Sequence, residues 1–165
     1  MAVREIRLFG DPVLKTQSVE INSIDGGIKA LVTDLLDTTA LPGRAGVAAP
    51  QIGVNLRAFS YNVNGTIGYI LNPEIVELGG DVVLVDEGCL SVPGIYDGVE
   101  RATQVKVKAL DEHGHERTIE ADGLLAVCIQ HELDHLMGKV FVEYLSPLKR
   151  NRIKTKLLKA QRDGD

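Results

Sequence analysis

The 165-residue sequence contains only two cysteines, no tryptophan and no long apolar run. No stretch approaches the roughly 20 apolar residues that a membrane-spanning helix needs. We therefore expect neither a membrane-spanning nor a secreted protein, and the expected location is the cytoplasm. Disulfides are rare in that compartment, so the two cysteines are expected to stay unpaired. The net charge of −5 argues against a general nucleic-acid-binding protein.

Internal repeats and linkers are absent as well, so the length predicts one domain over residues 1–165 with a single core. Apolar spacing predicts a helix over 24–39 that ends near Pro42. Alternating or β-branched runs predict strands around 56–61, 68–71, 82–85, 105–109 and 117–121, the last two forming a hairpin. Because strands and helices do not alternate regularly, the expected fold class is α+β with antiparallel sheets around a central helix.

The most informative segment is His131-Glu132-Leu133-Asp134-His135, an HExxH pattern. Apolar spacing over 124–137 predicts a helix, with Asp122 as its N-cap and Gly138 after its end. Four residues apart on a helix, His131 and His135 project from one face, which suits a catalytic divalent metal. Glu132 lies about 100° round the helix and can reach a water molecule on that metal. The segment therefore predicts a metal-dependent hydrolase.

Two histidines leave the metal short of a third protein ligand. One metalloprotease class has a third histidine six residues after the second, but here that position is Phe141. Glu143 is a weak alternative because no helical stretch separates it from His135. Cysteine remains, and we favour Cys89, in a segment broken by glycines and proline, over Cys128 on the helix itself. Spacing alone leaves both cysteines open.

A third segment, 43–53, is rich in glycine and alanine and contains Gln51. Its small residues leave room for the approach of another backbone. The Gln51 amide is an uncharged donor for a developing oxyanion.

Three segments together resemble one family, the peptide deformylases, which remove the formyl group from N-terminal formyl-methionine. These are Ala45-Gly46-Val47-Ala48-Ala49-Pro50-Gln51, Glu87-Gly88-Cys89-Leu90-Ser91 and Gln130-His131-Glu132-Leu133-Asp134-His135. The resemblance implies that Cys89, His131 and His135 hold one divalent metal. It further implies ferrous iron in the cell, with zinc, nickel or cobalt as alternatives.

The resemblance also implies roles for the other site residues. Glu132 would take a proton from the attacking water and return it to the departing amine, while Gln51 and the Leu90 backbone N–H face the oxyanion. The peptide would lie extended between Ala45 and Gly46 on one side and Gly88 on the other. Leu124, Val127 and Cys128 lie on or near the metal-facing side of the predicted helix, before His131, so we expect them to line an apolar methionine pocket. The alternative is that they are plain core residues.

Two positions depart from the family pattern. Arg44 stands where the first motif usually opens with glycine, and Tyr96 stands where many bacterial members carry an arginine. A phenol does not supply the charge of an arginine. Arg101 does match a family arginine, and we expect it to pair with an acid such as Asp134.

The C-terminal segment reverses the net charge, because seven cations gather between Lys149 and Arg162. Ile153, Leu157, Leu158 and Gln161 fit the apolar side of a basic amphipathic helix. The plain interpretation is a solvated helix packed by one face. By similarity to some bacterial deformylases, the alternative is docking on the ribosome, where anionic RNA suits these cations.

The expected partners are therefore formyl-methionyl nascent peptides and, through the basic helix, the ribosome. The rival functions are a general metallopeptidase, which would cleave peptide bonds, and a non-catalytic metal-binding relative. A structural metal site would have four protein ligands and no open position.

Overall fold

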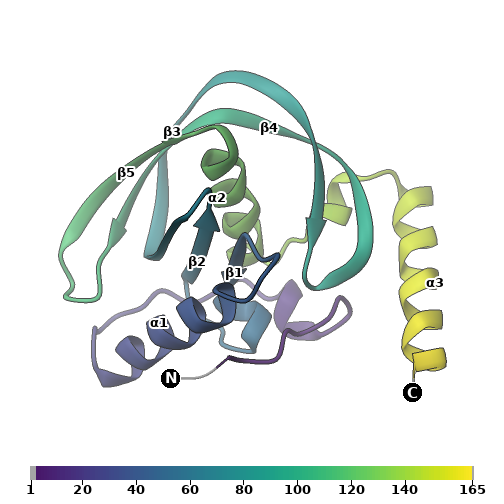
Figure 1. Ribbon diagram of the computed structural model, residues 1–165, viewed down its shortest axis with the longest axis horizontal. Helices are drawn as coiled ribbons and strands as arrows, with labels where there is room; N and C mark the ends of the chain where they lie inside the picture. The colour runs from purple at the N-terminus through teal and green to yellow at the C-terminus, as the bar shows by residue number, and fades with distance from the viewer. Residues whose placement is uncertain (1–2, 165) are drawn as a thin grey trace.

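The computed structural model describes residues 3–164, and the side chains of residues 3–159. Its elements, in chain order, are η1 (Pro12–Lys15), α1 (Gly26–Thr39), β1 (Gly46–Ala48), η2 (Ala49–Ile52), β2 (Ala58–Val63), β3 (Thr66–Cys89), β4 (Val92–Leu110), β5 (Glu116–Asp122), α2 (Gly123–Leu136), η3 (Phe141–Tyr144) and α3 (Pro147–Gly164). Figure 1 shows β3, β4 and β5 arching as a long bowed ribbon over α2, with α3 standing to one side. None of the described helices has the length and apolar character needed to span a membrane.

All five strands belong to one antiparallel sheet in the order β1-β2-β3-β4-β5. The expected α+β class is confirmed, but the sequence predicted several sheets. The difference arises because the runs 68–71 and 82–85, predicted as separate strands, both lie in β3. Register shifts between β3 and β4 let this long strand bend, so its first part pairs with β2 and the rest pairs with β4 alone.

This arrangement leaves several strand edges open, including one edge of β1 and one edge of the far part of β3. Among the described residues, β1 pairs only with β2, and the part of β3 beyond Leu71 pairs only with β4. Backbone N–H and C=O groups on an open edge are free to pair with another extended chain.

The core holds α2 against the inner side of the sheet. Ile129 and Leu136 of α2 are fully buried beside Phe59, Ile70 and Val107 of the strands. A second cluster packs α1 against β1 and β2, and a third packs η3 and α3 against β4. Since α2 is central to the sheet, polar residues on it are held in a rigid, dry setting.

The predicted helices and hairpin are present with small changes of boundary. β4 and β5 form the hairpin, and α1 and α2 occupy the predicted segments. The C-terminal helix is also present, with Ile153 and Leu157 buried. The prediction that Leu158 belongs to the packed side is wrong, because Leu158 is 58% exposed. The side chains of Gln161 and Arg162 lie outside the described residues.

Helices α1 and α2 begin differently. Asp25 is the N-cap of α1, and its carboxylate accepts a hydrogen bond from the Ile28 backbone N–H at 3.1 Å. Asp122 occupies the N-cap position of α2, as predicted, but its side chain makes no capping hydrogen bond.

We therefore expect Asp25→Ala to lower the free energy of unfolding by about 1 kcal/mol, since a helix N–H loses its partner. The matched variant Asp122→Ala removes no such bond and should cost at most about 0.5 kcal/mol. Urea denaturation of both variants tests this, and equal losses would contradict it.

Candidate metal centre and active site

Cys89, His131 and His135 converge on one point. Cys89 ends β3, at the tight turn into β4, while both histidines project from α2. The Cys89 Sγ lies 3.3 Å from the His135 Nε2, and one donor atom from each of the three residues falls within 4.8 Å of the others. One sulfur and two imidazole nitrogens are a donor set suited to a divalent transition metal.

Cys128, the alternative third ligand, lies elsewhere. Its thiol donates to the Ala45 carbonyl at 3.4 Å, and it is not part of the cluster formed by Cys89 and the histidines. Burial raises the pKa of Cys128 well above its ordinary value, which favours the neutral thiol. Of the two cysteines, the fold therefore brings Cys89 to the histidines.

Glu132 lies beside this cluster in a dry environment. The residue is only 3% exposed, and its Oε1 is buried without a hydrogen-bond partner among the described residues. Burial raises the pKa of Glu132 to about 7. A carboxyl group with this pKa is suited to exchange a proton near neutral pH.

Gly46 allows Glu132 to take this position. A Cβ atom at Gly46 would lie 2.7 Å from the Glu132 Oε2 and 3.0 Å from the Cys128 Sγ. Any other residue at this position would push against both side chains, so β1 approaches α2 closely because it carries glycine here.

Gln51 approaches the cluster from η2. Its Oε1 accepts from the Ala48 backbone N–H at 2.9 Å, which fixes the orientation of the amide. Its Nε2 then donates to the Ser91 hydroxyl at 3.1 Å and lies 3.6 Å from the Cys89 Sγ. The donor end of Gln51 thus faces the sulfur and the turn that contains Leu90.

A buried network surrounds His131. The Glu87 carboxylate lies 2.7 Å from the His131 Nδ1 and accepts two hydrogen bonds from the Arg101 guanidinium, at 2.5 and 2.8 Å. Arg101 also donates to Asp134 at 2.8 Å, so the pairing predicted from the sequence is present. Asp134 accepts in turn from the Tyr144 hydroxyl at 2.9 Å.

The network controls the charges around the histidines. Burial acts to raise the pKa of Glu87, but hydrogen bonds from Arg101 and His131 outweigh it and lower this pKa. The Glu87 carboxylate therefore stays ionised. Against the effect of burial, hydrogen bonds with Cys89 and Glu87 raise the pKa of His131 well above its ordinary value. Burial lowers the pKa of His135, which favours a neutral imidazole. The surroundings of His131 therefore favour positive charge.

Glu87 and Ser91 were not assigned roles from the sequence. A signal was available for Glu87, because alternation along a strand places it on the same face as Cys89, two residues later. The contact between Gln51 and Ser91 spans 40 positions of the chain and has no local signature.

A cleft of about 610 Å³ opens beside the cluster. It is lined by most of the residues that the sequence analysis selected, namely Ala45, Gly46, Gln51, Gly88, Cys89, Leu90, Leu124, Val127, Cys128, His131 and Glu132. His135 is fully buried behind them. Tyr96 also borders the cleft, which meets the open edges of β1 and β3.

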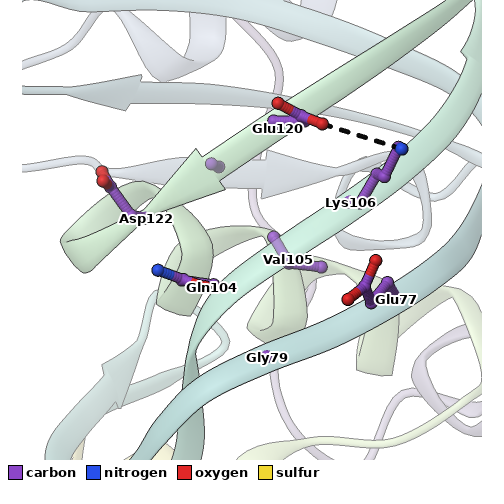
Figure 2. A pocket seen from close by; sticks show the side chains of 8 residues that line it. Glu77, Gly79, Gln104, Val105, Lys106, Glu120 and Asp122 are labelled. Atoms are coloured by element: carbon purple, nitrogen blue, oxygen red, sulfur yellow. Dashed lines mark ion pairs between the residues drawn. The ribbon is translucent and has the colours of Figure 1, made fainter.

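A second hollow, of about 490 Å³, lies over β3, β4 and β5 away from the cluster (Figure 2). Its polar side chains include Glu77, Gln104 and Asp122, and Lys106 pairs with Glu120 at 3.7 Å. It contains none of the candidate site residues.

The chain has close relatives of known family. The model of the polypeptide deformylase family matches residues 3–151. Peptide deformylase 1 of Ralstonia nicotianae is 49% identical over 98% of this chain and 97% of the relative, and the peptide deformylase of Neisseria gonorrhoeae is 48% identical over 98% of each chain.

Solved structures agree with this. A peptide deformylase from Legionella pneumophila superimposes with a TM-score of 0.91 at 44% identity, covering 98% of this chain and 96% of that one. The peptide deformylase of Ehrlichia chaffeensis, solved in complex with actinonin, gives a TM-score of 0.92 at 39% identity over 98% and 99% of the two chains. This chain therefore belongs to the polypeptide deformylase family.

Proposed function

We propose that residues 1–165 form one catalytic domain that hydrolyses the formyl amide of N-formyl-methionyl peptides and releases formate. Membership of the family supports the reaction. The single observation that carries the assignment to residues is the convergence of Cys89, His131 and His135 beside the buried carboxylate of Glu132. We further propose that the protein acts in the cytoplasm on newly made chains.

Cys89, His131 and His135 would hold a divalent metal. The donor set fits such an ion, and the anionic surroundings that raise the pKa of His131 would stabilise a cation in the same way. Glu87 would orient His131 through the contact with its Nδ1, as carboxylates do for metal-binding histidines. When bound, the metal supplies Lewis acidity, which lowers the pKa of a water molecule. Ferrous iron is our proposal for the cell, with zinc, nickel or cobalt as substitutes.

Glu132 is the proposed proton carrier. Its unpartnered Oε1 is free to accept a proton from the attacking water, and its raised pKa lets it donate that proton afterwards. The oxygen of the attacking water forms a bond to the formyl carbon. The proton then passes from Glu132 to the departing amine nitrogen as the C–N bond breaks. Formate and a free amino terminus are the products.

Gln51 and Leu90 are the proposed oxyanion donors. The amide of Gln51 is held by Ala48 and points its Nε2 toward the cluster, so it needs little rearrangement to donate to a developing negative charge. The Leu90 backbone N–H lies in the turn that lines the same cleft.

The substrate backbone would lie as an added strand between the open edges of β1 and β3. Ala45 and Gly46 would pair on one side and Gly88 on the other, which makes recognition largely independent of side chains. The methionine side chain would enter the cleft beside Leu124, Val127 and Cys128, which line it from α2.

We expect Glu132→Gln to lower kcat for formate release from formyl-Met-Ala by about 10²- to 10⁴-fold, because the proton carrier is lost. The protein should be loaded with ferrous iron under argon, and the iron content of the variant should match that of the wild type. Glu143→Gln, the matched control, should retain full activity and metal. Undiminished turnover in Glu132→Gln would contradict the mechanism, and mass spectrometry would show any cleavage of the Met-Ala bond.

Metal content should separate the two cysteines. Cys89→Ala is expected to lose the bound metal, whereas Cys128→Ala should keep about one ion per chain because its thiol faces Ala45. Elemental analysis after anaerobic dialysis measures this. In the cobalt-loaded protein, the thiolate-to-cobalt charge-transfer absorption should vanish in Cys89→Ala and persist in Cys128→Ala. The reverse pattern would reassign the third ligand.

We also propose that the exposed cations of α3 dock on ribosomal RNA. Lys154 and Lys156 are exposed on this helix, while Ile153 and Leu157 hold it against the core. Exposed cations are attracted to phosphates through charge and counterion release.

Replacing both Lys154 and Lys156 by glutamate should weaken co-sedimentation with ribosomes about tenfold at low salt, and less at high salt. Activity on a short formyl peptide should not change. The double variant Lys29→Glu/Lys139→Glu alters net charge equally away from α3 and should bind normally. Equal losses in both double variants would contradict docking through α3.

A further inference from the structure

Tyr96 and Gly88 face each other across β4 and β3. A Cβ atom at Gly88 would lie 2.3 Å from the Tyr96 Cε2 and 2.6 Å from its Cδ2, so the aromatic ring rests on the glycine backbone. Tyr96 is nevertheless 68% exposed. The ring is thus fixed in position on one side and open to solvent on the other.

The two faces of this ribbon differ. Glu87 and Arg101 point to the inner face, where both are buried around the cluster. Because side chains alternate along a strand, Gly88 and Tyr96 belong to the outer face. Tyr96 belongs to β4, and its ring covers Gly88 of the neighbouring strand β3. The ring therefore extends from β4 toward the open edge of β3.

A peptide added to the open edge of β3 alternates its side chains in the same way. Its first side chain, the methionine, enters the cleft on the inner face, so its second side chain points to the outer face. On the outer face, the Tyr96 ring covers β3 at Gly88.

We propose that Tyr96 determines the preference for the residue after formyl-methionine, favouring aromatic and large apolar side chains over small or acidic ones. This inference rests on the proposed function. The ring offers an apolar surface with no charge, and aromatic pairs gain free energy beyond simple area burial. Recognition of the second residue then comes from Tyr96, while the strand pairing remains indifferent to sequence.

The test compares kcat/KM for formyl-Met-Phe-Ser, formyl-Met-Ala-Ser and formyl-Met-Asp-Ser. The wild type should prefer the phenylalanine peptide over the alanine peptide about threefold to tenfold. The difference should lie in KM with kcat unchanged, because the contact is equal in the ground state and the transition state. In Tyr96→Ala the ratio should fall to about one, and Tyr96→Phe should keep it.

Leu84→Ala is the matched control. Leu84 is an exposed apolar residue on the same face of β3, four residues before Gly88, and its loss should leave the ratio unchanged. A ratio of one in the wild type, or a ratio that survives in Tyr96→Ala, would overturn the inference.

A second measurement is independent of turnover. Calorimetry with the product peptides Met-Phe-Ser and Met-Ala-Ser should show tighter binding of the first by the same factor in the wild type and Tyr96→Phe, but equal binding in Tyr96→Ala. Absence of formate from every peptide would count against the proposed function, and the calorimetric comparison would still decide whether Tyr96 makes this contact.

Discussion

The buried carboxylate of Glu87 constrains the whole site. A charge held at 6% exposure is tolerable only with partners, and it has an Arg101 guanidinium on one side and the His131 imidazole on the other. These partners come from β4 and α2, so one charged group fixes three elements relative to each other. Removing one member would leave a buried charge unpaired, which costs about 3–5 kcal/mol. The ion pair is therefore better understood as a positioning device than as a net source of stability.

Two glycines complete this arrangement on opposite faces of the same site. Gly46 lets β1 approach α2 so closely that the Glu132 carboxylate occupies the space of the missing side chain. Gly88 does the same for the Tyr96 ring on the outer face. Close approach of backbone to side chain thus produces both the dry inner wall around Glu132 and the outer surface around Tyr96.

Rigid and open parts of the site have different structural origins. Glu132 and His135 lie on the central helix, enclosed by the sheet. Burial there raises the pKa of Glu132 and lowers the pKa of His135, so the neutral form of each side chain is favoured. The cleft, in contrast, is bounded by strand edges without partners among the described residues. A fixed candidate centre beside an open strand edge is compatible with the proposed pairing of an extended peptide backbone.

Local patterns in the sequence were sufficient to predict α2 with His131, Glu132 and His135 on it, the β4–β5 hairpin and the C-terminal helix, because helical and strand periodicity depend on near neighbours. Spacing left Cys89 and Cys128 open, and only the family resemblance pointed clearly to Cys89. Tertiary structure shows that Cys89 is the cysteine beside the histidines, since Cys89 and His135 stand 46 positions apart and the bend of β3 brings them together. It also joined the strands into one sheet and gave Glu87 its partners. Contacts between distant residues depend on how elements pack, and that packing leaves no periodic trace in the chain.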